Sequence, residues 1–178
     1  MDASSKEETW VGQPGPVFTL TDLNGQPHSL ADDRGRIVIL NFWSAECPYA
    51  KRVDQLLIPW LATQGDGVAL LPLACNANES LELLRTTAAQ RGLPPVLWDE
   101  HHHLVEAYGA VTTPHFFVLD GQGIVRYQGA YDDVSFRQRT PTRFYLPEAV
   151  EALRAGRLPE VAQTQPYGCA IVRWSESE

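Results

Sequence analysis

Apolar and polar residues alternate along the chain in blocks that predict a mixed α/β fold. Residues 37–43 are almost all apolar and begin with β-branched side chains, which is typical of a central strand buried on both faces. Apolar residues then recur at helical spacing from Pro48 to about residue 63, and Pro48 suits a first helical turn. A second strand is expected over residues 68–74, broken at Pro72. Such a strand–helix–strand unit must be parallel, with a right-handed crossover.

Turn signals and shorter apolar runs place the remaining elements around this unit. Asn24-Gly25 lies between two short apolar runs and predicts a β-hairpin before the first central strand. Asn78 and Gly92 are expected to cap a helix over about 79–90. The other expected elements are a strand over 96–98, a helix over 101–108, a hairpin of strands 115–119 and 124–128, and a helix over 144–154. The economical arrangement is a mixed central sheet with helices on both faces.

The length of 178 residues predicts one domain with an extension at each end. Residues 1–11 are expected to form a flexible N-terminal arm, and residues 12–156 the folded domain. Residues 157–178 are expected to form an extended, mobile tail that carries Cys169. The three cysteines are too few for a disulfide scaffold.

Charge and motif content exclude several classes of function. The net charge of −8 argues against a nucleic-acid partner or an anionic membrane surface, because phosphate groups would be repelled. Residues 1–9 lack the pattern of a signal peptide, so we expect a cytoplasmic location, or a periplasmic one if a leader has been removed. No phosphate loop or dinucleotide fingerprint is present, so no cofactor is expected. Consecutive histidines at 101–103 point in different directions on a helix, so no metal site is expected.

Three segments carry a resemblance to a known superfamily. Residues 41–50, Asn-Phe-Trp-Ser-Ala-Glu-Cys-Pro-Tyr-Ala, resemble the N-F-W-A-x-W-C-P-x-C signature of thioredoxin-like proteins of the TlpA and ResA type. Residues 111–115 resemble the cis-proline loop of that superfamily, and Gly168-Cys169 resembles the ending of a peroxiredoxin-like subgroup of the redoxin (AhpC/TSA) families. The resemblance implies a thioredoxin-like fold: a mixed central β-sheet flanked by helices, with an N-terminal β-hairpin extension and an extended C-terminal tail.

The chain departs from the thioredoxin pattern at three positions that affect the chemistry. Ala50 stands where C-x-x-C has its second cysteine, so Cys47 cannot close a disulfide within its own motif. Glu46 stands where thioredoxins carry a tryptophan. Asn41 occupies the position of the buried acid of thioredoxin, so the proton relay that this acid provides is missing.

Cys47 is the expected nucleophile. A cysteine at a helix N-terminus ionises readily, because unpaired N–H groups and the helix dipole stabilise the thiolate. We therefore expect an accessible Cys47 sulfur that is partly ionised. Candidate stabilisers of the thiolate are Ser44, Lys51 and Arg126, whereas the carboxylate of Glu46 opposes ionisation.

The resemblance assigns substrate contacts to residues on both sides of the cysteine. Pro114 is expected to form a cis peptide bond with Thr113. In thioredoxin folds this loop faces the active cysteine and offers backbone groups to a bound substrate chain. His115 follows it, and Trp43 and Pro48 flank the cysteine. We expect these five residues to form the substrate-binding surface.

An oxidised Cys47 needs a second thiol to resolve it. Cys169 is the internal candidate, because Pro166 and Gly168 allow the tail before it to bend. The alternative is that Cys169 only packs the tail against the domain. Cys75 ends a central strand and is expected to be a core residue.

Three functions remain open at this point. The first is a thiol-disulfide oxidoreductase that acts through Cys47 on a protein or small-molecule disulfide, with thioredoxin or glutathione as thiol reductant. The second is a peroxiredoxin-type peroxidase that takes a peroxide substrate and uses Cys169 for resolution. Its P-x-x-x-T-x-x-C motif is partly matched, since Ser44 stands for the threonine but Leu40 replaces the proline. The third is a non-catalytic binding module with the thioredoxin fold.

Overall fold

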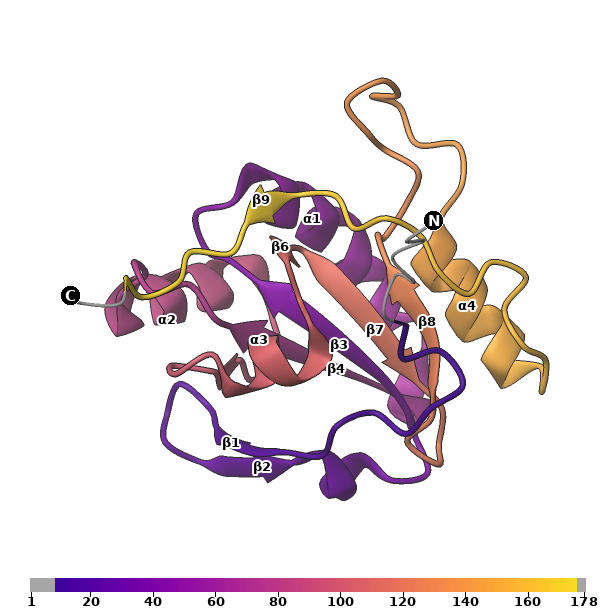
Figure 1. Cartoon of the computed structure of the whole chain (residues 1–178), viewed down its shortest axis with the longest axis horizontal. Helices are drawn as coiled ribbons and strands as arrows, with labels where there is room; N and C mark the ends of the chain where they lie inside the picture. The colour runs from indigo at the N-terminus through magenta and orange to yellow at the C-terminus, as the bar shows by residue number, and fades with distance from the viewer. Residues whose placement is uncertain (1–8, 176–178) are drawn as a thin grey trace, which may run out of the picture.

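The centre of the protein is a mixed five-stranded sheet in the order β5-β4-β3-β7-β8 (Figure 1). The structure is a computed structural model that describes residues 9–175, so most of the predicted arm at 1–11 lies outside the described residues. Three strands are parallel, namely β3 (Ile37–Trp43), β4 (Val68–Ala74) and β5 (Leu97–Trp98). The sheet is completed by two antiparallel strands, β7 (His115–Leu119) and β8 (Val125–Gly129).

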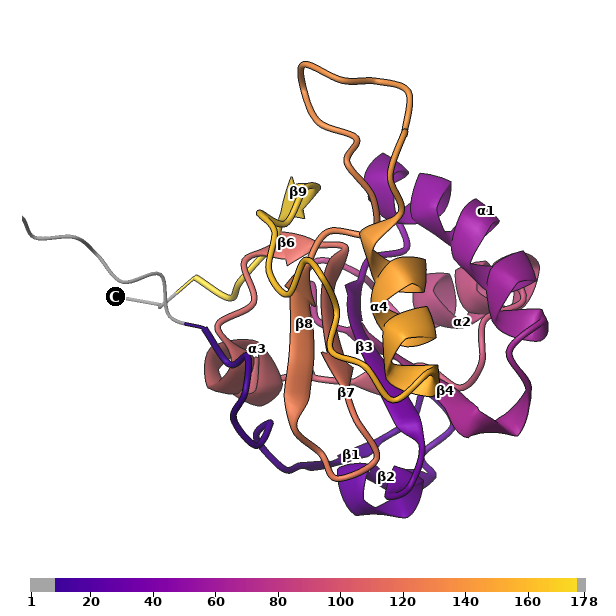
Figure 2. The same ribbon diagram turned by 90° about the vertical axis from the view of Figure 1, so that its right-hand side faces the viewer.

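Helices and a hairpin cover the two faces of this sheet (Figure 2). One face packs against α1 (Pro48–Ala62) and α4 (Tyr145–Arg154). The other packs against α3 (His103–Tyr108) and the hairpin of β1 (Thr19–Thr21) and β2 (Pro27–Ser29). The helix α2 (Leu81–Arg91) lies beside α1, and short 3-10 turns occur at η1 (Leu30–Asp33) and η2 (Gly65–Gly67). This confirms the predicted thioredoxin-like arrangement.

Two local predictions about these elements were wrong. Pro72 does not break β4, which pairs with β3 along its whole length. The proline is tolerated because β5 pairs only with Leu73 and Ala74, so β4 has no second hydrogen-bonded neighbour at Pro72. The cap of α2 is Ser80 rather than Asn78, since the Ser80 hydroxyl accepts from the Leu83 amide at 3.1 Å.

The C-terminal tail is bound to the domain along much of its described length, which corrects the expectation that it is mobile. Its strand β9 (Cys169–Ala170) pairs antiparallel with β6 (Thr112–Thr113). Before this strand, the Thr164 amide donates to the Gln128 carbonyl in β8 at 3.0 Å. After it, the Ile171 amide donates to the Val111 carbonyl at 3.2 Å. Both cysteine-bearing segments therefore meet at the end of the sheet where β3 leads into α1.

No helix among residues 9–175 has the length and apolar character that a membrane span requires.

Candidate active site

Cys47 is the N-cap of α1, directly after the turn that follows β3. Pro48 occupies the first helical position, as predicted, and the Lys51 amide donates to the Cys47 carbonyl at 3.0 Å to close the first turn. The sulfur therefore lies beside the unpaired N–H groups that open the helix.

A buried carboxylate holds the turn before Cys47. The Glu79 carboxylate accepts from the Ser44 hydroxyl at 2.5 Å and from the Ala45 amide at 3.0 Å. The Ser44 oxygen in turn accepts from the Cys47 amide at 3.1 Å and from the Glu46 amide at 3.2 Å. Ser44 was predicted to act on the thiolate, but these contacts show that it fixes the backbone of the turn instead.

Cys169 lies directly against Cys47. The two Sγ atoms are 2.7 Å apart, although the residues are separated by 122 positions in the sequence. Cys169 pairs with Thr113 across the β6–β9 ladder, and the Thr113–Pro114 peptide bond is cis, as predicted. The Thr113 carbonyl is 3.1 Å from the Cys47 sulfur. Both cysteines and the cis-proline loop are thus in contact at one point of the structure.

The environment favours charge on Cys47 and disfavours it on Cys169. Burial raises the pKa of Cys47, but hydrogen bonds from the Cys169 thiol and the Ala50 amide outweigh it, so the pKa lies below its ordinary value. Burial and the nearby charge of Cys47 raise the pKa of Cys169 to about 12. Cys169 therefore remains a thiol when Cys47 ionises, and it then donates to the Cys47 sulfur.

The expectation of an accessible Cys47 sulfur was wrong, because residue 47 is 4% exposed. The residue belongs to an apolar cluster against which Cys169 also packs, so the tail covers it. Tyr167 in the tail contacts Tyr49 in the first turn of α1, with ring centroids 5.0 Å apart. The cover is thus attached to the helix that carries the nucleophile.

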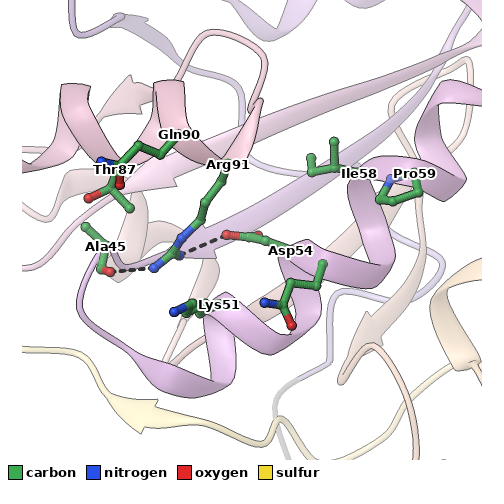
Figure 3. Close-up of a pocket in the computed structure, with 9 residues that line it drawn as sticks. Ala45, Lys51, Asp54, Ile58, Pro59, Thr87, Gln90 and Arg91 are labelled. Atoms are coloured by element: carbon green, nitrogen blue, oxygen red, sulfur yellow. Dashed lines mark hydrogen bonds and ion pairs between the residues drawn. The ribbon is translucent and has the colours of Figure 1, made fainter.

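Trp43 is fully buried, which corrects its assignment to the substrate surface. Its Nε1 donates to the Asp54 carboxylate at 2.8 Å, and the Arg91 guanidinium lies over its ring. Arg91 also donates to Asp54 at 3.0 Å and to the Ala45 carbonyl at 2.7 Å (Figure 3). Trp43 therefore helps to fix the turn before the cysteine from inside the protein.

Neither predicted cation reaches the thiol. The Nε of Arg126 donates to Asp120 at 2.9 Å, and Arg126 lies in β8 at the opposite end of the sheet from Cys47. Lys51 is exposed and lines a pocket of about 640 Å³ between α1 and α2 together with Asp54 and Arg91 (Figure 3). Backbone and thiol donors stabilise the thiolate instead of either predicted cation.

His115 is buried at the start of β7 and is not part of an open substrate surface. Its Nδ1 accepts from the Val111 amide at 3.3 Å, and its ring stacks on Phe117 with centroids 4.7 Å apart. Burial lowers its pKa to about 4, so the ring is neutral near pH 7. His115 thereby holds the segment before the cis proline.

Cys75 is a buried core residue, as predicted. Burial, with Asp99 and Glu79 nearby, raises the pKa of its thiol far above the ordinary range. Cys75 is therefore set apart from the reactive pair in both position and ionisation.

Sequence reasoning missed the residues that connect the two cysteine-bearing segments. The side-chain nitrogen Nδ2 of Asn76 donates to the Glu79 carboxylate at 3.3 Å. The side-chain oxygen Oδ1 of Asn76 accepts from the backbone amide of Val172 at 2.8 Å. Glu79 holds the turn before Cys47, and Val172 follows β9, so Asn76 bridges the two. In the sequence, Asn76 is only a polar residue after a strand, and nothing near it indicates that it connects the two segments.

Comparison with known proteins agrees with the fold. Residues 11–128 match the sequence profile of the AhpC/TSA family. The chain belongs to the AhpC/TSA family. It is 33% identical over 125 residues to the thiol-disulfide oxidoreductase ResA of Geobacillus thermodenitrificans, covering 69% of this chain and 71% of that protein. It is 33% identical over 134 residues to the thiol:disulfide interchange protein DsbE of Tatumella citrea, covering 74% and 71%.

Two solved structures match almost the whole chain. An uncharacterised conserved protein from Geobacillus kaustophilus has a TM-score of 0.85 at 28% identity and covers 94% of both chains. A hypothetical protein from Sinorhizobium meliloti has a TM-score of 0.86 at 26% identity and covers 96% of this chain and 98% of its own. Coverage this high includes part of the C-terminal tail, so that part belongs to the shared fold.

Proposed function

We propose that the protein is a thiol-disulfide oxidoreductase in which Cys47 and Cys169 form the redox pair. The observation that carries the proposal is the 2.7 Å separation of the two sulfurs beside the cis-proline loop. A disulfide bond is about 2.05 Å long, so the pair needs only a small movement to close. The chain is similar to the thiol-disulfide oxidoreductase ResA and the thiol:disulfide interchange protein DsbE, which supports this class of reaction.

The two thiols have different ionisation, which gives the reaction an order. The Cys47 thiolate attacks one sulfur of a substrate disulfide, whose S–S bond breaks to release the first substrate group as a thiolate that takes up a proton from water. The mixed disulfide removes the negative charge from Cys47, so one cause of the raised pKa of Cys169 disappears. Cys169 then gives its proton to the departing second substrate thiolate and attacks the Cys47 sulfur. Two electrons have passed to the substrate, and the protein holds a Cys47–Cys169 disulfide that a thiol reductant reopens.

Mass spectrometry after oxidation with glutathione disulfide tests this proposal. The wild type should yield a peptide that joins Cys47 to Cys169, and Cys169→Ser should keep a glutathione adduct on Cys47. Cys47→Ser should form neither product, and Cys75→Ser should behave as the wild type. A persistent adduct on Cys47 with a free Cys169 thiol in the wild type would contradict the proposal.

Hydrogen peroxide in the same assay separates the oxidoreductase from a peroxidase. The guanidinium of Arg126, a predicted stabiliser of the thiolate that would also suit a peroxidase site, bonds to Asp120 at the far end of the sheet. We therefore expect peroxide to oxidise Cys47 more slowly than glutathione disulfide does. Faster oxidation by peroxide would favour the peroxidase.

A further inference from the structure

The C-terminal strand β9 occupies the backbone edge beside the reactive cysteine. Its residues Cys169 and Ala170 pair with Thr113 and Thr112, the two residues that precede the cis proline (Figure 1). Among the described residues, β9 is the only strand paired with β6. A foreign polypeptide that approached Cys47 as an added strand would need this same edge.

Close packing at two glycines fixes the path of the tail. A Cβ atom on Gly168 would overlap the Thr113 carbonyl and lie 3.0 Å from the Pro114 ring. A Cβ atom on Gly129 would overlap the backbone and hydroxyl of Thr164, farther back in the tail. The absence of side chains at these positions lets the tail lie directly on the cis-proline loop and on β8.

Hydrogen bonds hold the tail on both sides of Cys169. On the N-terminal side, the Thr164 hydroxyl accepts from the Ala130 amide at 2.9 Å and contacts the Tyr127 hydroxyl at 2.7 Å. On the C-terminal side, Val172 donates to Asn76, and the Ala77 amide donates to the Val172 carbonyl at 2.9 Å. Only the short segment between these anchors can shift without breaking them.

We propose that the bound tail makes the protein selective for small-molecule disulfides, such as glutathione disulfide, over disulfides in polypeptides. This inference rests on the oxidoreductase function proposed above and names its substrate class. Cys169 is partly exposed whereas Cys47 is covered, so a small disulfide needs only a local shift of residues 166–168 to reach the pair. A polypeptide must displace β9 from β6, which breaks the β6–β9 ladder.

The test compares mixed-disulfide formation on Cys47 with two substrates. The background is Cys169→Ser, in which the adduct accumulates. The substrates are glutathione disulfide and a synthetic unstructured peptide closed into a ring by one disulfide. Each rate constant is divided by the rate constant for the reaction of the same disulfide with free cysteine in solution. This ratio corrects for the intrinsic reactivity of the disulfide.

Two variants displace the tail by different means. Gly168→Val forces the tail away from the cis-proline loop, because its side chain meets the Thr113 carbonyl. A chain that ends at Pro166 lacks β9 altogether and keeps the Thr164 contacts. Gly67→Val is the matched control, since a Cβ atom at Gly67 meets nothing within 4 Å.

We expect displacement to raise the corrected peptide rate by about tenfold or more relative to the glutathione disulfide rate. Gly67→Val should leave this ratio unchanged. If the ratio of the peptide rate to the glutathione disulfide rate is unchanged in both displaced variants, the inference is overturned. This holds whether neither of the two rates rises or both rise equally. Failure of Cys169→Ser to form an adduct with either substrate refutes instead the oxidoreductase function on which the inference rests.

Discussion

The Ser44 hydroxyl donates a 2.5 Å hydrogen bond to the buried carboxylate of Glu79, 35 residues later in the chain. Glu79 also accepts from the Ala45 amide, and Ser44 accepts from the Cys47 amide. Glu79, which directly precedes the N-cap of α2, thus holds the turn that places the nucleophile at the start of α1. This connection makes Glu79 a positioning residue for Cys47.

Removal of the Glu79 carboxylate should destabilise the fold. Glu79→Ala leaves the Ser44 hydroxyl and the Ala45 amide without their buried acceptor, so we expect the unfolding free energy to fall by about 2 kcal/mol. Glu79→Gln keeps one acceptor oxygen and should lose less. Glu82→Ala removes an exposed carboxylate from the first turn of α2, three residues later, and serves as control. Urea unfolding measures all three, and equal stability of Glu79→Ala and Glu82→Ala would refute the role.

Local sequence patterns were sufficient for most elements of the fold. The apolar run at 37–43 became β3, Pro48 opened α1, and the Asn24-Gly25 turn joined β1 to β2. Each of these follows from neighbours in the sequence. The continuity of β4 through Pro72 does not, because it depends on how far β5 extends along β4.

The sequence predicted the parts of the candidate site that a motif defines. It mispredicted the residues whose place depends on tertiary contacts. Cys47, Cys169 and the cis Pro114 were named from motifs, and the structure brings them together. Arg126 was misplaced because the register of β7 with β8 puts it at the other end of the sheet. Glu79 was missed because the turn before Cys47 that it holds lies 33 to 35 residues away.

Loss of Arg91 should leave the buried Asp54 without its cation. Both side chains are largely buried, at 15% and 2% exposure. We expect Arg91→Met to lower the unfolding free energy by about 3 kcal/mol, because it leaves an uncompensated buried charge. Burial already raises the pKa of Asp54, so the deficit should shrink as the pH falls and Asp54 takes up a proton.

Two further variants test this interpretation of Arg91. Asp54→Asn combined with Arg91→Met removes the buried charge and should recover part of the stability. Arg137→Met makes the same change on an exposed loop and should alter stability little. A loss in Arg91→Met no larger than in Arg137→Met would show that Asp54 needs no cation.

Replacement of Cys169 should change the ionisation of Cys47 according to whether a donor remains. Burial opposes the Cys47 thiolate, and the Cys169 thiol is a donor that favours it. Cys169→Ala removes the donor, whereas Cys169→Ser supplies a hydroxyl in its place. At neutral pH we expect Cys47 in the alanine variant to react with iodoacetamide several-fold more slowly than in the serine variant. Coincident pH profiles of alkylation in the two variants would show that residue 169 does not stabilise the thiolate.

His115 should make the protein less stable in mild acid. Burial lowers its pKa from 6.5 to about 4, so the folded state holds a neutral ring while the unfolded state takes up a proton as the pH falls below 6.5. Above this pH the group contributes no pH dependence. Between pH 6.5 and 4 it should reduce the unfolding free energy by a total of about 3 kcal/mol, and below pH 4 its contribution should level off.

Denaturant unfolding across this pH range isolates the contribution of His115 by substitution. His115→Phe keeps a ring that can stack on Phe117 but loses the acceptor for the Val111 amide. It should therefore show a constant loss of stability together with a shallower decline between pH 6.5 and 4. His101→Phe makes the same change at an exposed position and should leave the slope of the wild type unchanged. If His115→Phe and the wild type decline with the same slope, the His115 ring does not remain neutral in the folded state.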